Sequence, residues 1–315
     1  MSAPGRLGVG VVGAGRVGAV LGSALRAAGH AVVGASGISA ESLERIDTLL
    51  PGVPVLDVPQ VVERAELVLL TVPDAALADL VVGLAELGRW QPGQIVLHTA
   101  GALGTAVLEP ARAMGAIPLA LHPAMTFTGT SMDLGRLTGC TVAVTAPAPV
   151  LPIGQALVVE IGGEPLVVAE ADRPLYHAAL AHGANHLVVL VAQAAQALAA
   201  AGVEAPDRAL GPLLHAALDG ALRTASSAAA GTAAASAGVA GLTGPVVRGD
   251  VGTVAAHLRV LTALAVRESS AGDVPGVYRA MARATTARSL AGGRITTAQA
   301  QELLDLLADT PLEGR

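Results

Sequence analysis

The chain contains no lysine, because all nineteen basic residues among its 315 residues are arginines. A Schiff-base lysine and a lysine general acid are therefore excluded from any chemistry that the protein performs. The single cysteine, Cys140, excludes an intramolecular disulfide and a metal cluster built on cysteines. Aromatic residues make up only 1% of the chain, so its core must be built from alanine, valine and leucine.

Charge is also scarce, and its balance is acidic. Charged residues make up 14% of the chain, and the net charge of −6 disfavours nucleic-acid binding, which needs clustered cations. The most apolar stretch, "HLVVLVAQAAQALAAAG", contains Gln193 and Gln196 and ends at Gly202, so we expect a buried helix and not a membrane span. With reduced cysteine and little chain before the first strand, the sequence predicts a cytoplasmic protein without nucleic-acid or membrane partners.

The N-terminal segment "RLGVGVVGAGRVGAVLGSALRAAGH" predicts a strand, a glycine turn and a helix. The turn has the G-x-G-x-x-G pattern of dinucleotide-binding proteins. In that pattern Gly13 permits the tight turn, Gly15 lets the backbone approach a pyrophosphate, and Gly18 lets helix and strand touch. The helix N-terminus provides free N–H groups and a positive dipole for phosphates. The predicted cofactor-binding residues of the turn are Gly13, Ala14, Gly15, Arg16, Val17 and Gly18.

The end of the second predicted strand, "HAVVGAS", bears on the choice of dinucleotide. An NAD site has an acidic residue there for the ribose hydroxyls, whereas this chain has none before Glu41. Ser36 can donate to a 2′-phosphate, as can Ser39, and Arg16 can lie near it unless it only faces solvent. The sequence therefore favours NADP over NAD.

Five further strands follow, in "ELVLLTVPD", "QIVLHTAGALG", "AIPLALHPAMTFTG", "CTVAVTA" and "PLVVAE". Ligands of open α/β sheets bind beyond the carboxyl ends of strands. Val72 and Pro73 should then lie where the dinucleotide passes, with Thr99 and His122 nearby. His98 falls at another strand end, and either histidine can be catalytic or structural. The pattern predicts an α/β Rossmann-type domain over residues 1–170, with a mainly parallel, doubly wound sheet.

Residues 171–315 show only helical patterns and predict an all-α domain. Helices are expected over Arg173–Ala201, 206–229, 250–267, 274–290 and 296–308. The first is too apolar on every side to face solvent, so we expect burial within the molecule or between the subunits of a homodimer. It carries His177, His182 and Asn185, which either line a site or satisfy neighbouring backbone groups.

The stretch "LTGPVVRGDVGTVAAHL" interrupts the helical pattern of residues 171–315. Gly-Pro ends a helix, and Asp250 is placed as the N-cap of the next one, which carries His257. No such structural role accounts for Arg248, which we expect to bind an anionic substrate or the cofactor phosphates.

Taken together, "GAGRVG", "TVPD", "HTAGALG", "LHPAMTF", "YHAA" and "LTGPVVRGD" resemble a bacterial family of oxidoreductases with a Rossmann-like domain and a C-terminal domain of unknown function. Its architecture is similar to that of pyrroline-5-carboxylate reductases, ketopantoate reductases and prephenate dehydrogenases. His122-Pro123 resembles the His-Pro of prephenate dehydrogenases, where the histidine contacts the reacting hydroxyl. Ketopantoate reductases use a lysine on the first helix of the second domain, which this chain lacks.

These observations predict an NADP-dependent oxidoreductase that moves hydride between nicotinamide and a small carboxylated C=O or C=N substrate. His122 is the first choice as proton donor and His177 the second, with Asn185 beside them. Thr99 and Arg248 are expected to hold the substrate carboxylate. The alternatives are an imine reductase of the pyrroline-5-carboxylate reductase type and a non-catalytic NADP-binding sensor or scaffold.

Overall fold

The computed structural model of the chain describes residues 6–229 and 241–308. The chain divides into two compact units, residues 1–183 and 184–315. The predicted domain boundary after residue 170 lies just before the long helix α8, and the first turns of that helix belong to the first unit.

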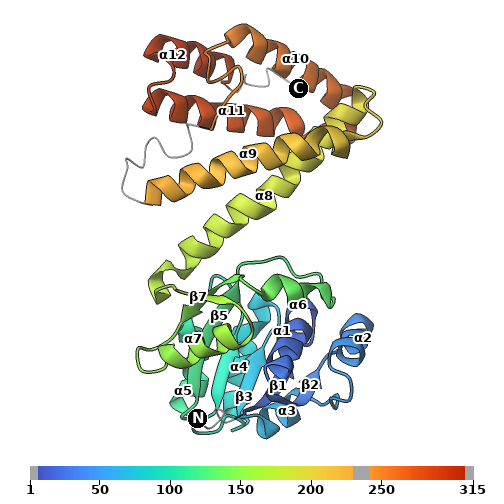
Figure 1. The fold of residues 1–315 in the computed structure, drawn as a ribbon, viewed down its shortest axis with the longest axis vertical. Helices are drawn as coiled ribbons and strands as arrows, with labels where there is room; N and C mark the ends of the chain where they lie inside the picture. The colour runs from blue at the N-terminus through green and yellow to red at the C-terminus, as the bar shows by residue number, and fades with distance from the viewer. Residues whose placement is uncertain (1–5, 230–240, 309–315) are drawn as a thin grey trace. The chain divides into compact units, whose positions relative to one another are not determined.

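The first unit is built on a seven-stranded sheet with the order β2-β1-β3-β4-β5-β6-β7 (Figure 1). All neighbouring strands are parallel except β5 and β6, which are antiparallel. This confirms the mainly parallel, doubly wound sheet that the sequence predicts. The strands are β1 Gly8–Val12, β2 Ala31–Ser36, β3 Leu67–Leu70, β4 Ile95–His98, β5 Ile117–Pro123, β6 Thr141–Thr145 and β7 Glu164–Val167.

Helices cover both faces of this sheet. The helices of the first unit before α8 are α1 Arg16–Ala27, α2 Ala40–Leu49, α3 Val58–Arg64, α4 Asp74–Glu86, α5 Glu109–Ala113, α6 Met132–Leu137 and α7 Leu151–Glu160. Two short 3₁₀ turns are η1 Thr105–Leu108 and η2 Glu170–Asp172. Ser39 and Asp57 close capping boxes at the starts of α2 and α3, and they satisfy backbone N–H groups that would otherwise lack partners.

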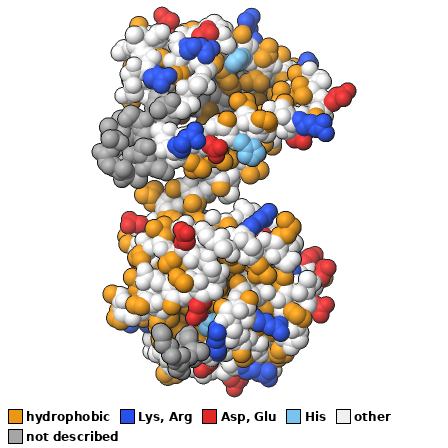
Figure 2. All heavy atoms as spheres, in the orientation of Figure 1, with side chains coloured by type: hydrophobic (Ala, Val, Ile, Leu, Met, Phe, Trp, Pro, Cys, Tyr) orange, Lys and Arg blue, Asp and Glu red, His pale blue; other side chains and the backbone are white. Residues whose placement is uncertain are grey.

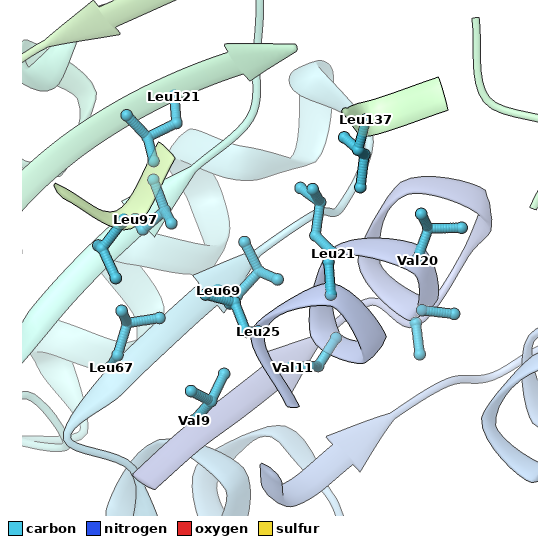
Figure 3. Close-up of a cluster of buried hydrophobic side chains, with 14 of the residues drawn as sticks. Val9, Val11, Val20, Leu21, Leu25, Leu67, Leu69, Leu97, Leu121 and Leu137 are labelled. Carbon is cyan, nitrogen blue, oxygen red and sulfur yellow. The ribbon is translucent and has the colours of Figure 1, made fainter. Parts of the chain in front are cut away.

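The alternation of side chains along each strand divides the core into two layers. Val9 and Val11 of β1 pack with Leu21 of α1 and Leu157 of α7 on one face, shown in part in Figure 3. Val12 belongs to the opposite layer, which includes residues of α3, α4 and α5. Successive residues of a strand point to opposite faces, so a strand buried on both sides must be apolar throughout.

The second unit contains the rest of α8 Arg173–Ala200, followed by α9 Pro206–Ala229, α10 Val251–Arg267, η3 Ser269–Ala271, α11 Val274–Ala291 and α12 Thr297–Leu306. These bounds confirm the all-α domain and place each predicted helix within a few residues. Its core consists of aliphatic side chains, as expected for a chain with few aromatic residues. It includes Val254 and Leu258 of α10 with Leu303 of α12.

Helix α8 departs from expectation. The sequence predicts that it is buried, yet Leu187, Val188 and Val189 are 38%, 69% and 46% exposed in the single chain. Burial within one molecule is therefore wrong, and burial between subunits stays a prediction. Among the described residues, the segment Glu170–Ala200 is long and apolar enough to cross a bilayer, judged by length and composition only.

Candidate active site

The glycine turn between β1 and α1 is formed as its pattern predicts. Gly13 has a φ of 85°, which favours glycine, and its carbonyl accepts a hydrogen bond from Thr71 Oγ1 at 2.7 Å. Ser36 holds the other side of the turn: its Oγ accepts from Gly13 N at 3.2 Å, and its carbonyl accepts from Ala14 N at 2.7 Å. The turn is therefore fixed by the ends of β2 and β3 as well as by its own glycines.

The other two glycines have distinct surroundings. A Cβ on Gly18 would overlap the Thr71 hydroxyl and approach Val11 Cγ1 to 3.2 Å, so helix and strand touch there. A Cβ on Gly15 would meet nothing nearer than the Gly13 carbonyl oxygen at 4.0 Å. Gly15 is also the N-cap of α1, with no side-chain cap and no acidic residue in the first turn. An uncapped helix N-terminus beside an open glycine backbone suits a phosphate.

A pocket of about 260 Å³ joins this turn to the ends of β4 and β5. It brings together four residues that the sequence assigned to one site: Arg16 and Val17 of the glycine turn, with Thr99 and His122 of the strand ends. The complete lining is Arg16, Val17, Thr99, His122, Pro123, Met125 and Phe127. Val72 adjoins the same turn, because a Cβ on Gly13 would lie 3.1 Å from its Cγ1, and Pro73 follows as the exposed N-cap of α4.

His122 lies at the centre of a cluster that only partly follows from the sequence. Its Nδ1 is 3.2 Å from the hydroxyl oxygen of Tyr176 on α8, and its ring meets the His177 ring edge to face with centroids 5.7 Å apart. A Cβ on Gly101 would lie 2.9 Å from His122 Nε2 and would overlap the His177 ring. Glycine at position 101 is thus required for the two histidines to lie this close to the chain after β4.

The environment of this cluster controls its protonation. Burial, the neighbouring His177 and the Arg173 guanidinium lower the pKa of His122 from 6.5 to about 4. Burial raises the pKa of Tyr176, while Arg173 opposes that effect. At neutral pH the pair is therefore a neutral imidazole and a protonated phenol. A neutral His122 is poorly suited to the predicted role of proton donor, whereas Tyr176 holds a proton to give.

His98, at the end of β4, has a structural role. It is fully buried, its Nδ1 accepts from Ala100 N at 3.2 Å, and its Nε2 donates to the Gly104 carbonyl at 2.8 Å. These bonds fix one neutral tautomer, and burial lowers its pKa to about 4. His98 thereby orders the loop that carries Gly101.

The expected 2′-phosphate end of the site differs in detail from the sequence interpretation. Ser36 is 8% exposed and bound to the glycine turn, and Ser39 Oγ accepts from Ser42 N at the start of α2. The assignment of Ser36 as a phosphate ligand stays a prediction. Two arginine side chains approach Gly129 in the loop after β5: a Cβ on Gly129 would lie 2.8 Å from Arg45 Nε and 2.9 Å from Arg16 Cγ.

The remaining predicted residues belong to the second unit. Asp250 is the N-cap of α10, as predicted, because its side chain accepts from Thr253 N at 3.0 Å. Arg248 is exposed. His257 Nδ1 is 2.9 Å from the Tyr278 hydroxyl, and Asn185 is exposed on α8. The roles of Arg248 and Asn185 in the site stay predictions.

Sequence reasoning missed Tyr176, Arg173 and Arg45. Tyr176 is one of only two tyrosines in the chain, and it directly precedes the predicted His177. That scarcity was an available signal. For Arg173 and Arg45 the sequence holds no comparable signal, because the chain has nineteen arginines and no lysine, so a single arginine does not stand out.

Comparison with known proteins agrees with this geometry. A family model for a Rossmann-like domain matches residues 2–123, and a model for a domain of unknown function, DUF2520, matches residues 140–285. The chain is a Rossmann-like protein with a DUF2520 domain. The resemblance stated from its motifs is confirmed. No curated protein matches this Rossmann-like DUF2520 protein in sequence.

Several solved structures share its fold. A candidate NADP oxidoreductase from Bacteroides fragilis has a TM-score of 0.66 at 19% identity, over 89% of this chain and 98% of that one. An imine reductase from Pseudomonas sp. has a TM-score of 0.64 at 18% identity, over 95% and 100%. The imine reductase from Myxococcus stipitatus in complex with NADP⁺ has a TM-score of 0.60 at 18% identity, over 94% and 99%. At these identities the likeness concerns the fold.

Proposed function

We propose that this Rossmann-like DUF2520 protein is an NADP-dependent oxidoreductase that reduces a small carboxylated C=O or C=N substrate. The observation that carries the proposal is the pocket that has the glycine turn at one side and Thr99 and His122 at the other. A dinucleotide bound at the turn would direct its reactive end toward groups able to exchange a proton. Structures with the same fold include a candidate NADP oxidoreductase and an imine reductase in complex with NADP⁺, which supports the choice of chemistry.

The residues of the turn fit the cofactor. The uncapped N-terminus of α1 and the open face of Gly15 would hold the pyrophosphate. Arg16 and Arg45 would hold the 2′-phosphate, because a phosphate monoester pairs best with guanidinium groups. Neither Ser36 nor Ser39 is an acid, and the first carboxylate after β2 is that of Glu41, close to Ser39 and Arg45.

The proton is assigned to Tyr176. Bound NADPH would supply the hydride to the substrate carbon, and the phenol would give its proton to the substrate oxygen or nitrogen. His122, neutral at physiological pH, would carry its proton on Nδ1 and donate it in a hydrogen bond to the Tyr176 oxygen. That bond leaves the phenolic proton free for the substrate and stabilises the phenolate that remains. Thr99, in the same pocket, would donate to the substrate carboxylate, and Arg248 would pair with it.

The second candidate is imine reduction. Two of the proteins with this fold are imine reductases, and an imine protonated in solution needs less help from an acid. The non-enzymatic alternative is a sensor that binds NADPH without oxidising it. Calorimetric titration with NADPH and NADH, followed by a turnover assay with 2-keto acids and cyclic imines, separates the three. Binding without turnover identifies a sensor, and turnover confined to imines identifies the second candidate.

We also propose that the protein forms a homodimer through its helices. Hydrophobic side chains, orange in Figure 2, are exposed along α8 and the helices of the second unit, among them Leu187, Val188 and Val189. A bilayer would have to accept Asn185, a polar side chain that is exposed on the same helix, and the transfer of an amide into an apolar environment is costly. A second copy of the chain can satisfy both kinds of side chain. Light scattering during size-exclusion chromatography tests this: a monomer would contradict it.

A further inference from the structure

Arg173, the first residue of α8, is 0% exposed and lies against the chain that follows β4, the middle of β5, and β6. Its Nε donates to Thr145 Oγ1 at 2.8 Å. One terminal nitrogen donates to the Ala120 and Ala143 carbonyls at 2.7 and 3.3 Å, and the other reaches the Ala100 and Gly101 carbonyls at 3.4 Å each. The guanidinium therefore joins β5, β6 and the chain after β4 to the start of α8.

All five of these acceptors are neutral oxygens. In the part of the chain that the structure describes, no carboxylate lies within ion-pair distance of Arg173. The nearby Glu170 is bound elsewhere, to Thr105 N at 2.8 Å and Ala106 N at 3.1 Å. Burying an unpaired charge is costly, and an arginine side chain does not deprotonate to avoid the cost. The hydrogen bonds to neutral oxygens satisfy the guanidinium donors, but no opposite charge neutralises the group.

The charge of Arg173 changes the pKa values of the candidate proton donor, Tyr176, and of its partner, His122. Tyr176 follows Arg173 by three residues on α8, and therefore lies on the same side of the helix. Burial and His177 lower the pKa of His122, and Arg173 lowers it further. Burial raises the pKa of Tyr176, and Arg173 acts against that increase. The guanidinium thus disfavours a protonated His122 and favours an ionised Tyr176.

We propose that Arg173 is a positioning residue whose fixed positive charge stabilises the Tyr176 phenolate formed when the phenol gives its proton to the substrate. The inference rests on the proposed function. In the balanced step, hydride from NADPH forms the new C–H bond, the Tyr176 O–H bond breaks, and its proton forms the O–H or N–H bond of the product. The phenolate then regains a proton from water. Arg173 contacts neither substrate nor cofactor in this step and acts through Tyr176 and His122.

The groups that face this pair come from several elements. His122 belongs to β5, and Tyr176 and His177 to α8. Burial raises the pKa of Tyr176, and Cys140, just before β6, raises it by a smaller amount. Among these groups Arg173 supplies the permanent positive charge, so replacing it should change the titration of Tyr176 in one direction.

The test uses the full-length protein in which Tyr278→Phe leaves Tyr176 as the only tyrosine. The phenol is titrated by its ultraviolet absorbance without cofactor, for Arg173, Arg173→Met and Arg173→Lys. We expect the methionine variant to raise the pKa of Tyr176 and to lower kcat about tenfold or more, since one pKa unit is a tenfold change in an equilibrium constant. The lysine variant should restore both values toward those of the parent, and the substrate KM should change less than kcat in either variant.

Other results would overturn the inference. An unchanged Tyr176 titration in a folded Arg173→Met variant would mean that the arginine only joins α8 to the sheet. Equal losses of kcat in the methionine and lysine variants would also mean that the positive charge at position 173 has no part in the reaction. If the methionine variant does not fold, Arg173→Lys decides alone: a parental titration with kcat lowered a hundredfold would show that the charge is not what the reaction uses. Failure of the parent protein to oxidise NADPH with any substrate overturns the proposed function instead.

Discussion

His122 Nδ1 and the Tyr176 hydroxyl oxygen lie 3.2 Å apart, although 54 residues separate the two in sequence. The contact joins the end of β5 to the first turn of α8, and it lies next to the pocket that reaches the glycine turn. The proposed chemistry depends on this contact, because it pairs a proton donor with a partner that can stabilise the ionised product.

The first prediction concerns this pair. Tyr176→Phe should lower kcat about a hundredfold or more, because the phenyl ring has no proton to give, and general acid catalysis contributes at least that factor. Binding of NADPH should stay within about twofold of the parent. Stopped-flow turnover and calorimetry measure the two quantities.

His122→Ala should also lower turnover by roughly a hundredfold while leaving NADPH affinity nearly unchanged. The matched control is His215→Ala, since His215 is exposed on α9 and lies in the other unit. Normal turnover in Tyr176→Phe together with lost turnover in His122→Ala would show that His122, and not Tyr176, is the proton donor. Normal turnover in both would point to His177.

The second prediction concerns the cofactor. NADPH should bind more tightly than NADH, and Arg45→Ala should reduce that preference about tenfold by removing one charge-assisted contact to the 2′-phosphate. Arg89→Ala, an exposed arginine elsewhere in the first unit, serves as the control and should change nothing. Ser36→Asp should reduce the preference through repulsion of the phosphate. Comparable dissociation constants for the two cofactors in the parent would contradict the assignment.

The third prediction is a dependence of stability on pH. His98 and His122 have pKa values of about 4, below the ordinary 6.5, with burial the main cause in both. The unfolded chain therefore takes up these protons first as the pH falls. Their contribution to stability is fully present above pH 6.5 and is lost between about 6.5 and about 4.

Chemical denaturation between these pH values measures the effect. The decrease in the free energy of unfolding should be shallower in His98→Gln, which removes one of the two groups. A pH dependence unaltered by this substitution would show that His98 does not titrate differently on unfolding.

The fourth prediction separates two neighbours in the stretch before α10. Arg248→Ala should raise the substrate KM, or weaken NADPH if the phosphates are its partner, with little change in thermal stability. Asp250→Ala should leave the substrate KM and NADPH binding unchanged. It should lower the unfolding midpoint by roughly 2 °C, because it removes the N-cap of α10. Unchanged kinetics in Arg248→Ala would leave this stretch as a helix boundary only.

Local patterns explain most of what the sequence could predict. The glycine turn, the strand ends and the Asp250 cap are each contained within a few residues, so the roles of Gly13, Gly18 and Asp250 follow from spacing and backbone conformation. The pocket also follows, because carboxyl ends of parallel strands meet at one edge of a sheet. The antiparallel β6 does not follow, since its pattern of apolar residues is the same in either direction.

The contacts made by α8 lie beyond such patterns. Arg173 joins the start of α8 to β5 and β6, and a buried arginine without an acidic partner has no signature in sequence. The approach of Arg16 and Arg45 to Gly129 likewise depends on the path of the loop after β5. Asp133 fixes that loop, since its side chain accepts from Thr128 N at 2.7 Å and Gly129 N at 2.8 Å.

The most direct test of the central claim is the oxidation of NADPH by the purified protein, followed by nicotinamide absorbance with a panel of 2-keto acids and cyclic imines. The account predicts that at least one substrate is turned over, faster with NADPH than with NADH, and that Tyr176→Phe removes about 99% of that rate. Tight binding of NADPH with no oxidation across the panel would contradict it and would identify a sensor.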